Sequence, residues 1–330
     1  MRIRARNWFI AGGAALGAAG LGFAISSFLP QRFDTYTWSS GETKKVPSGT
    51  AVLPAVEVQF LRCGSVTIPE PVAVRGSFSL APCMIAYSGV LVRHPRATFL
   101  YDTGLCSNIF RFLAGQPLFF RKTLANFDFV QSLRSHLVQQ ELDLADLDFA
   151  LLSHLHWDHV SGIPDIPGVS LRVNRVEYDA VQLGLLDANA GLVRHLMGKN
   201  PIELFEMNGP AYEGFRSSYD LFGDGSVVLV PLPGHTAGNT GMFINRANGQ
   251  RLFLLGDAAW VAQNYLRPAT MHPFIWSKVT SDDATARQTL IDLYHFARRQ
   301  PEVTMLAMHD AALQEQFMAN ERERAAVGIS

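Results

Sequence analysis

The sequence predicts an α/β fold in which helices cover β-sheets. Short apolar segments bounded by turn residues fall into two groups, one within residues 52–174 and one within 227–307, and helical segments lie between them. Interspersed helices favour helix-covered sheets over an all-β sandwich. Hydrophobic residues make up 48% of the 330 residues and charged residues 17%, so the chain has ample material for a core. The length suits one large α/β domain or two average ones.

The first thirty residues form a hydrophobic targeting segment, which precedes the fold. Arginines within the first six residues precede an apolar run, rich in Gly and Ala, from Trp8 to Leu29. The run is long enough for one membrane span, and the arginines would stay in the cytoplasm. The small residues Ala24 and Ser26 also fit a cleaved signal peptide. We therefore expect residues 1–30 to be a signal peptide or an anchor, and an extracytoplasmic domain, periplasmic or secreted. Residues 8–29 would tie an uncleaved chain to the inner membrane.

Residues 31–50 are predicted to be a linker, because Ser, Gly, Lys and Pro dominate them without apolar periodicity. Residues 51–330 then form the folded domain. Runs rich in branched and apolar residues predict strands in its first half at Val52–Leu61, Met84–Val92, Thr98–Tyr101, Phe149–Leu152 and Leu171–Asn174. Residues 107–141 are predicted to be helical or irregular. Their apolar stretch at 110–120 either packs in the core or forms a substrate-side lid or membrane-facing loop.

The second half repeats this pattern. Strands are predicted at Val227–Leu232, Met242–Asn245, Leu252–Leu255 and Val303–Ala307. A hairpin turn at Asn248–Gly249 joins the second and third of them. Residues Asp282–Arg299 have helical spacing, with Thr280 or Ser281 as the expected N-cap.

Charge and cysteine content exclude several classes of protein. The formal net charge is −1, so the chain has no basic field for nucleic acid. Three cysteines cannot build a disulfide framework, and no Cys-x-x-Cys pair indicates a thiolate zinc site. At most one disulfide bridge can form.

A dense cluster of metal-binding residue types follows the predicted strand Phe149–Leu152. It comprises His154, His156, Asp158 and His159. On a turn that leaves a strand, the first two histidines can converge on one ion, while the aspartate and the last histidine face a neighbouring ion. A single zinc would leave one of the four idle, so the cluster indicates two metals.

Three further candidate ligands follow predicted strands. These are His235, Asp257 and His309, each placed directly after an apolar segment. Loops at strand ends build sites on a rigid scaffold. Together with the first cluster they supply the five histidines and two aspartates that a dinuclear site requires. The other five histidines lack such a context and are expected to be ordinary residues.

These motifs, in this order, resemble those of the metallo-β-lactamase-fold metallohydrolases. The matching segments are His-x-His-x-Asp-His at 154–159, Gly-His-Thr at 234–236, Gly-Asp-Ala at 256–258, His-Asp at 309–310 and an earlier Asp-Thr-Gly at 102–104. The resemblance covers about residues 51–312. It implies an αβ/βα four-layer sandwich of two similar halves, with the site along one edge.

The resemblance also implies a ligand set for two Zn²⁺ ions per chain, or another divalent metal. The first metal would be held by His154, His156 and His235, the second by Asp158, His159 and His309, and Asp257 would bridge both. Two such ions lower the pKa of a shared water, and the resulting hydroxide attacks a carbonyl. Asp158 is the expected catalytic residue, which orients the nucleophile and passes a proton to the leaving group.

Within the superfamily, the spacing of His235, Asp257 and His309 is most similar to that of N-acyl homoserine lactone lactonases. This resemblance implies a dinuclear-zinc hydrolase of a lactone or related ester, and hence a small-molecule ester-like substrate and a quorum-quenching role. The apolar stretch at 110–120 could accept an acyl chain. Those lactonases commonly have Tyr where this chain has Trp260, which we expect to bind substrate by shaping the acyl pocket.

Two other functions stay open. A glyoxalase II-like thioesterase would need a basic pocket for glutathione, for which Lys278, Arg298 and Arg299 are weak candidates. A non-catalytic metal-binding module is the third class, although a full set of seven ligands argues against it. The sequence does not indicate an oligomeric state.

Overall fold

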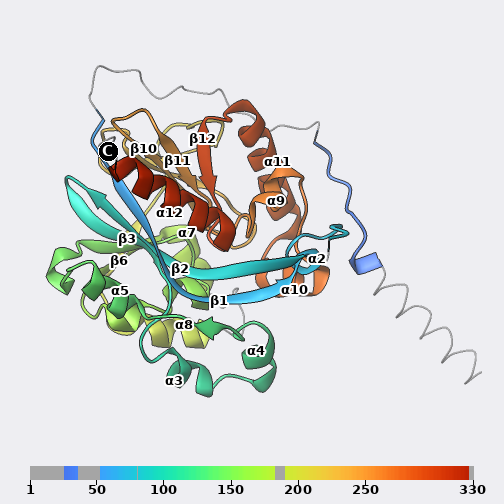
Figure 1. Ribbon diagram of the computed structural model, residues 1–330, viewed down its shortest axis with the longest axis horizontal. Helices are drawn as coiled ribbons and strands as arrows, with labels where there is room; N and C mark the ends of the chain where they lie inside the picture. Colours follow the sequence, from blue (N-terminus) through green and yellow to red (C-terminus); the bar gives the residue numbers. More distant parts are fainter. Residues whose placement is uncertain (1–25, 36–52, 80, 183–189, 327–330) are drawn as a thin grey trace, which may run out of the picture.

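Two sheets packed face to face carry helices on their outer faces, which gives four layers (Figure 1). This arrangement is seen in a computed structural model that describes residues 26–35, 53–79, 81–182 and 190–326. The first sheet has the strand order β4-β1-β2-β3-β5-β6-β7, and the second has the order β12-β11-β10-β9-β8. The predicted four-layer αβ/βα sandwich is confirmed.

The first sheet combines an antiparallel and a parallel part. Its strands are β1 (Glu57–Pro69), β2 (Pro82–His94), β3 (Ala97–Thr103), β4 (Asp128–Phe129), β5 (Phe149–Leu152), β6 (Ser170–Asn174) and β7 (Ile202–Phe205). Strands β1, β2 and β3 pair antiparallel, whereas β3, β5, β6 and β7 are parallel. Every residue of β5 is buried, which explains its continuous apolar sequence. The parallel pairing places the ends of β3 and β5 at the same edge.

The second sheet follows the same logic. Its strands are β8 (Tyr219–Asp220), β9 (Val227–Pro231), β10 (Thr240–Asn245), β11 (Arg251–Leu254) and β12 (Val303–Leu306). The predicted hairpin joins β10 to β11, and Gly249 supplies the positive φ of 80° that its turn requires. Strand β12 pairs parallel to β11, so these two strands also end at one edge.

Helices cover the two outer faces. On the first sheet lie α3 (Ile109–Ala114), α4 (Leu118–Thr123), α5 (Leu133–Gln139), α6 (Trp157–Val160), α7 (Arg175–Gln182) and α8 (Ala190–Met197). On the second sheet lie α9 (Ala262–Leu266), α10 (Pro273–Val279) and α11 (Asp283–Arg299). The remaining α-helices are α2 (Glu70–Ala73) and α12 (Ala311–Ala326), and 3₁₀ turns span Leu144–Asp146 and Ile163–Asp165.

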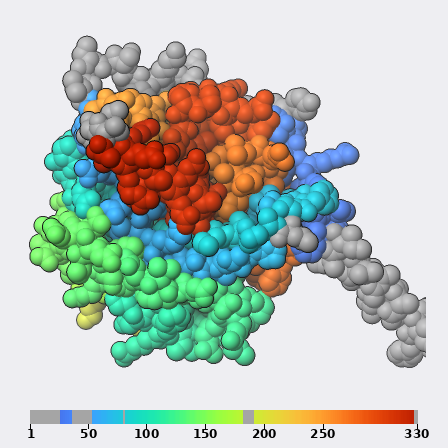
Figure 2. Space-filling view, in the orientation of Figure 1, coloured from blue at the N-terminus to red at the C-terminus, as the bar shows by residue number. Residues whose placement is uncertain are grey.

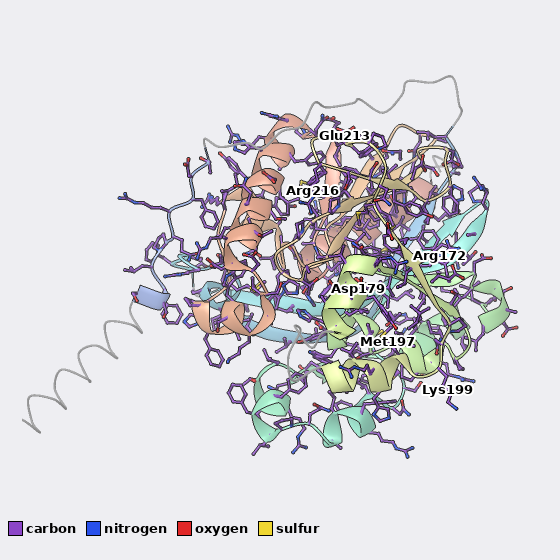
Figure 3. All side chains as sticks on the ribbon, turned by 180° about the vertical axis from the view of Figure 1, so that it is seen from behind. Arg172, Asp179, Met197, Lys199, Glu213 and Arg216 are labelled. Carbon is purple, nitrogen blue, oxygen red and sulfur yellow. The ribbon has the colours of Figure 1, made fainter. Side chains whose placement is uncertain are left out.

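The back of the molecule shows how the last strands of the first sheet connect to its helices (Figure 3). From Arg172 in β6 the chain runs through Asp179 in α7 to Met197 in α8. The loop that carries Glu213 crosses to the second sheet, where this carboxylate lies 2.7 Å from the guanidinium of Arg251 in β11. Loops of both halves are thereby fixed to the sheets.

Buried aromatic side chains fill the space on both sides of the second sheet. Between the sheets, Phe99 and Phe149 stack with centroids 4.8 Å apart. On the outer side, the rings of Phe243 and Phe253 stack at 3.8 Å and meet Phe296 of α11. Aromatic burial of this extent gives the strand ends a rigid base.

Most strand predictions agree with the structure, with differences at some ends. Strand β1 begins at Glu57 and runs to Pro69, eight residues beyond its predicted end at Leu61. The predicted N-cap of α11 was wrong. Asp282 caps the helix through its carboxylate, which accepts from the Thr285 amide, because it alone directly precedes the first helical residue.

The predicted anchor or signal run falls mostly outside the described residues, since 1–25 are not described. The same holds for much of the predicted linker, because the description also lacks 36–52. Among the described residues, no helix combines the length and hydrophobicity of a membrane span. The division into segments 1–30, 31–50 and 51–330 therefore stays a prediction. Cys63, Cys83 and Cys106 are all free thiols.

Candidate metal centre

All seven candidate ligands gather at the edge where strands of both sheets end. The turn after β5 carries four of them, and His235, Asp257 and His309 follow β9, β11 and β12. Five of the seven are buried, and His156 and Asp158 are half-buried. Parallel strand pairing explains this placement, because it brings the ends of β3 with β5 and of β11 with β12 together.

Three histidines form one group. The Nδ1 atom of His156 lies 3.1 Å from Nε2 of His154 and 2.8 Å from Nε2 of His235. These three ring nitrogens face a common point. The structure therefore brings together the three residues expected at the first metal.

A second group contains the other expected trio. Oδ2 of Asp158 lies 3.5 Å from Nε2 of His309 and 3.9 Å from Nε2 of His159. The ligand atoms of these three residues also lie within 4.8 Å of one another.

Asp257 lies between the two groups. Its Oδ2 atom is 3.4 Å from Nε2 of His235 in the first group and 3.1 Å from Nε2 of His309 in the second. Its Oδ1 atom is 3.2 Å from Nε2 of His159. Oδ2 thus lies near both groups, and Oδ1 faces the second, so Asp257 is placed where it could contact ions held by either group.

The donor chemistry fits zinc-class ions. Imidazole nitrogens and carboxylate oxygens are the ligands that Zn²⁺ accepts in proteins. Within the described residues, Nε2 of His159 and Oδ1 of Asp257 are buried and have no hydrogen-bond partner. Buried polar atoms normally have partners, and a bound cation would satisfy both.

Burial keeps the first group neutral. It lowers the pKa of His156 to about 4 and that of His235 to about 3. It also lowers the pKa of His154 well below its ordinary value, with a further contribution from His159. Neutral imidazole is the form that binds metal.

The second group has the opposite electrostatics. Burial would lower the pKa of His159 and His309, but the carboxylate of Asp257 and its neighbours outweigh burial and raise both. For Asp257 itself, burial raises the pKa, and the two imidazoles lower it well below its usual range. The carboxylates thus favour positive charge at this position, which a divalent cation could supply in place of the imidazole protons.

Comparison with known proteins identifies the family. Residues 85–294 match the sequence family described as the Metallo-beta-lactamase superfamily. The chain belongs to this superfamily.

Individual relatives agree with this membership of the metallo-beta-lactamase superfamily. An N-acyl homoserine lactonase AttM from Rhizobium radiobacter is 29% identical over 123 residues, which are 37% of this chain. The chain spans 45% of that relative's length. A probable metallo-hydrolase, Rv2300c, from Mycobacterium tuberculosis is 26% identical over 278 residues, 79% of this chain and 82% of the relative.

A solved structure shares the fold. It is that of an N-acyl homoserine lactone hydrolase with the product N-hexanoyl-L-homoserine bound at the catalytic metal center. The TM-score is 0.60 at 17% identity, over 81% of this chain and 97% of the other. At this identity the likeness supports the metallo-beta-lactamase fold alone.

Asp102, in the Asp-Thr-Gly segment at the end of β3, supports the ligands of this superfamily site. Its Oδ2 atom lies 2.8 Å from Nδ1 of His159 and accepts from the Ser153 hydroxyl at 2.8 Å. Because Nδ1 of His159 donates its hydrogen to Asp102, its Nε2 atom can bind a metal. Asp102 has a φ of 56°, a left-handed conformation that is uncommon outside glycine. The sequence drew attention to the segment but not to this contact.

The imidazoles of His309 and His154 are oriented in the same way. Nδ1 of His309 lies 2.6 Å from the Ala86 carbonyl oxygen, and Nδ1 of His154 lies 2.9 Å from the Ser153 hydroxyl. Both rings therefore present Nε2 to the site.

Glu177 in α7 is a supporting residue that the sequence did not reveal. It is fully buried, and its carboxylate accepts from the Leu155 amide at 2.9 Å and the Gly238 amide at 2.8 Å. Burial raises its pKa, which these hydrogen bonds partly offset. One carboxylate thus joins the ligand turn of the first half to the His235 loop of the second. In the sequence, a lone glutamate such as this resembles any surface charge.

Trp260, expected to bind substrate, contacts the bridging aspartate. Its indole Nε1 donates to Oδ2 of Asp257 at 3.0 Å, and its ring lies 5.3 Å from that of His309. It is half-buried beside the site. This position allows Trp260 to orient Asp257. The sequence analysis expected it only to shape the acyl pocket.

Tyr87 was also missed, because it lies within the apolar strand β2. Its ring centroid is 5.8 Å from those of His309 and Trp157. Burial, together with the charges of Asp158 and Asp257, raises the pKa of its hydroxyl. Among the described residues no hydrogen bond of this hydroxyl is found.

Aromatic side chains build the wall next to Tyr87. The Trp157 ring lies 5.8 Å from Phe120 of α4 and 6.0 Å from Phe127. The apolar stretch at 110–120 thus contributes a buried ring to the site wall, while Phe110, Leu118 and Phe119 are exposed. The prediction of core packing holds for Phe120, while the alternative of a substrate-side lid or membrane-facing loop stays a prediction for the exposed residues.

Proposed function

We propose that the protein is a metal-dependent hydrolase that cleaves a lactone or related ester, with N-acyl homoserine lactones as its substrates. The observation that carries the proposal is the position of Asp257 between two groups of ligands at the carboxyl ends of strands. The lactonase relatives support the substrate class. The aromatic wall beside the site suits an acyl chain.

We further propose two Zn²⁺ ions per chain. The first would be held by His154, His156 and His235, the second by Asp158, His159 and His309, with Asp257 between them. Bound zinc would polarise the substrate carbonyl and lower the pKa of water.

The side chains of the protein supply the remaining functions. Asp158 is half-buried, with 13% of its side chain exposed, so it can reach both the site and a substrate. Its carboxylate orients the attacking water and passes a proton to the leaving oxygen. Trp260 orients Asp257, and the hydroxyl of Tyr87 can donate to a substrate oxygen. The rings of Trp157 and Phe120 keep water from the acyl chain.

A turnover panel tests the proposal. Zinc-loaded protein should open the ring of N-hexanoyl and N-decanoyl homoserine lactone. The acyl homoserine product is measured by mass spectrometry. Turnover of S-lactoylglutathione and cephalosporins should be at least about 100-fold slower, the size of discrimination that pocket contacts supply. Faster turnover of the thioester would replace this proposal with the glyoxalase II-like one.

No specific observation favours the other functions. Lys278, Arg298 and Arg299 are exposed on α10 and α11, so these three do not form a glutathione pocket.

We also propose that the catalytic domain, residues 51–330, is extracytoplasmic, behind an anchor or signal at residues 1–30 and a linker at residues 31–50. Arginines ahead of the Trp8–Leu29 run support this orientation. Alkaline phosphatase fused after residue 50 should be active, whereas a version without residues 1–30 should be silent. Mass spectrometry of the mature amino terminus distinguishes cleavage from anchoring. A silent full-length fusion would refute the orientation.

A further inference from the structure

Large apolar side chains lie exposed around α4, and other described residues leave them uncovered. Leu118 is 63% exposed and Phe119 53%. Nearby, Phe274 of α10 is 44% exposed, Phe28 45% and Leu29 48%. We call these five side chains the aromatic face. Folded proteins rarely leave several large apolar groups together in water without a binding role.

Contacts between distant segments make this a single surface. The rings of Phe119 and Phe274 meet edge to face at 6.0 Å, which joins α4 of the first half to α10 of the second. The ring of Phe28 lies 4.7 Å from that of His272, two residues before Phe274. Figures 1 and 2 show these segments along one side of the domain.

Several cations lie near the aromatic face. Arg111, Arg121, Lys122 and Lys278 are exposed on its helices. Acidic residues are missing from 103–127 and from 258–281, the two sequence segments that build most of it. Asp282 and Asp283 lie just beyond the second of these segments, and Asp34 lies shortly after Leu29. Exposed aromatic and aliphatic groups with several cations on the same helices suit a bilayer with anionic headgroups.

The apolar amino-terminal run ends at the same face. The carbonyl oxygens of Ser26 and Leu29 accept from the Arg75 guanidinium at 2.9 and 3.2 Å. These contacts fix the end of the run, residues 26–29, beside Arg75, and the Phe28 ring lies against His272 at the start of α10. If the run enters a membrane, the aromatic face lies at the membrane surface.

From these observations we propose that the aromatic face docks on the surface of an anionic lipid bilayer. The proposal goes beyond hydrolysis and does not depend on the substrate. Because Phe120 of α4 packs on Trp157 in the site wall, docking would also hold the metal centre close to the lipid surface.

Fluorescent labels at single cysteines test the docked orientation in the full-length protein. Phe119→Cys and Phe274→Cys are each labelled with the NBD fluorophore in a Cys83→Ser background, because Cys63 and Cys106 are buried. The matched control is Val138→Cys on α5, a helical position that is 68% exposed outside the aromatic face. Each labelled protein is reconstituted into vesicles of phosphatidylcholine and phosphatidylglycerol.

We expect the emission at positions 119 and 274 to shift to shorter wavelength, with at least twofold stronger quenching by spin-labelled lipid than at position 138. Adding Leu118→Asp to the position-274 protein should diminish the shift, whereas Val176→Asp on α7 should not. Equal signals at positions 119 and 138, or no shift, would overturn the proposal. A shift without vesicles that grows with protein concentration would assign the face to a second copy of the chain. Phe274→Cys keeps the test decisive if Phe119→Cys does not fold.

Discussion

Asp158 is more exposed than Asp257. We therefore expect Asp158 to carry a proton during the reaction and Asp257 to hold the metal. Of the two carboxylates, 13% of the Asp158 side chain is exposed and 3% of the Asp257 side chain. We expect Asp158→Asn to lower kcat by about 100-fold or more, the range that a general acid contributes, while most of the metal remains. Asp257→Ala should instead lose metal. Stopped-flow kinetics with elemental analysis of each variant makes the comparison.

The matched control for these variants is His195→Ala, which removes a histidine of α8 outside the ligand set. It should keep both activity and metal. Full activity of Asp158→Asn would show that another group donates the proton, and the Tyr87 hydroxyl is one candidate.

The indole of Trp260 gives a second prediction. Trp260→Phe removes the donor to Oδ2 of Asp257 but keeps an aromatic ring against His309. Loss of a hydrogen bond to a metal ligand typically weakens metal binding about 10- to 100-fold. Titration with a zinc-buffering chelator should show this loss, and excess zinc should restore most of kcat/KM.

Trp260→Tyr serves as the control, since its hydroxyl can again donate, and we expect a smaller loss. If Trp260→Phe keeps its zinc affinity but changes its acyl-chain preference, Trp260 only shapes the pocket wall and does not orient Asp257.

Glu177 connects α7 to the two ligand loops, so we expect its replacement to lower the stability of the fold. In Glu177→Gln the side chain keeps one acceptor oxygen for two amides, Leu155 and Gly238. A buried amide left without a partner costs about 1–3 kcal/mol. Thermal unfolding of the metal-free protein should show a Tm several degrees lower. Asp179→Asn, an exposed change on the same helix (Figure 3), should leave the Tm unchanged.

The buried strands and the ligands were predictable from sequence for the same reason, whereas the short or mostly exposed strands β4, β7 and β8 were missed. A buried strand such as β5 is apolar throughout, and the polar ligands stand directly at its end, so composition along the chain reveals both. Helix α12 has charged residues along its length and buries few side chains, so its periodicity is weak. Contacts such as Asp102 to His159 join residues 57 positions apart, and no local pattern indicates them.

For the molecule as a whole, the centre connects the two halves of the sandwich. Four ligands come from the turn after β5 in the first sheet and three follow strands of the second. A ligand that binds only the folded protein stabilises it by about 2.7 kcal/mol at 100 times its Kd. Chelation should therefore lower the Tm of the entire domain in one transition, and two equivalents of Zn²⁺ should restore it.

Calorimetry of the chelated and reloaded protein measures this effect. The matched control is the Asp257→Ala protein, in which chelation should change the Tm little. Restoration by one equivalent of zinc would argue for a mononuclear centre.

The three free thiols set a condition on folding outside the cytoplasm. Burial raises the pKa of Cys63 and of Cys106 to about 12 and that of the half-buried Cys83 to about 11, so the native thiols resist oxidants, which attack the thiolate. The unfolded chain has no such protection. An exported chain would therefore have to fold before disulfide-forming catalysts trap a non-native pair. Export into cells that lack those catalysts should raise the yield of folded protein.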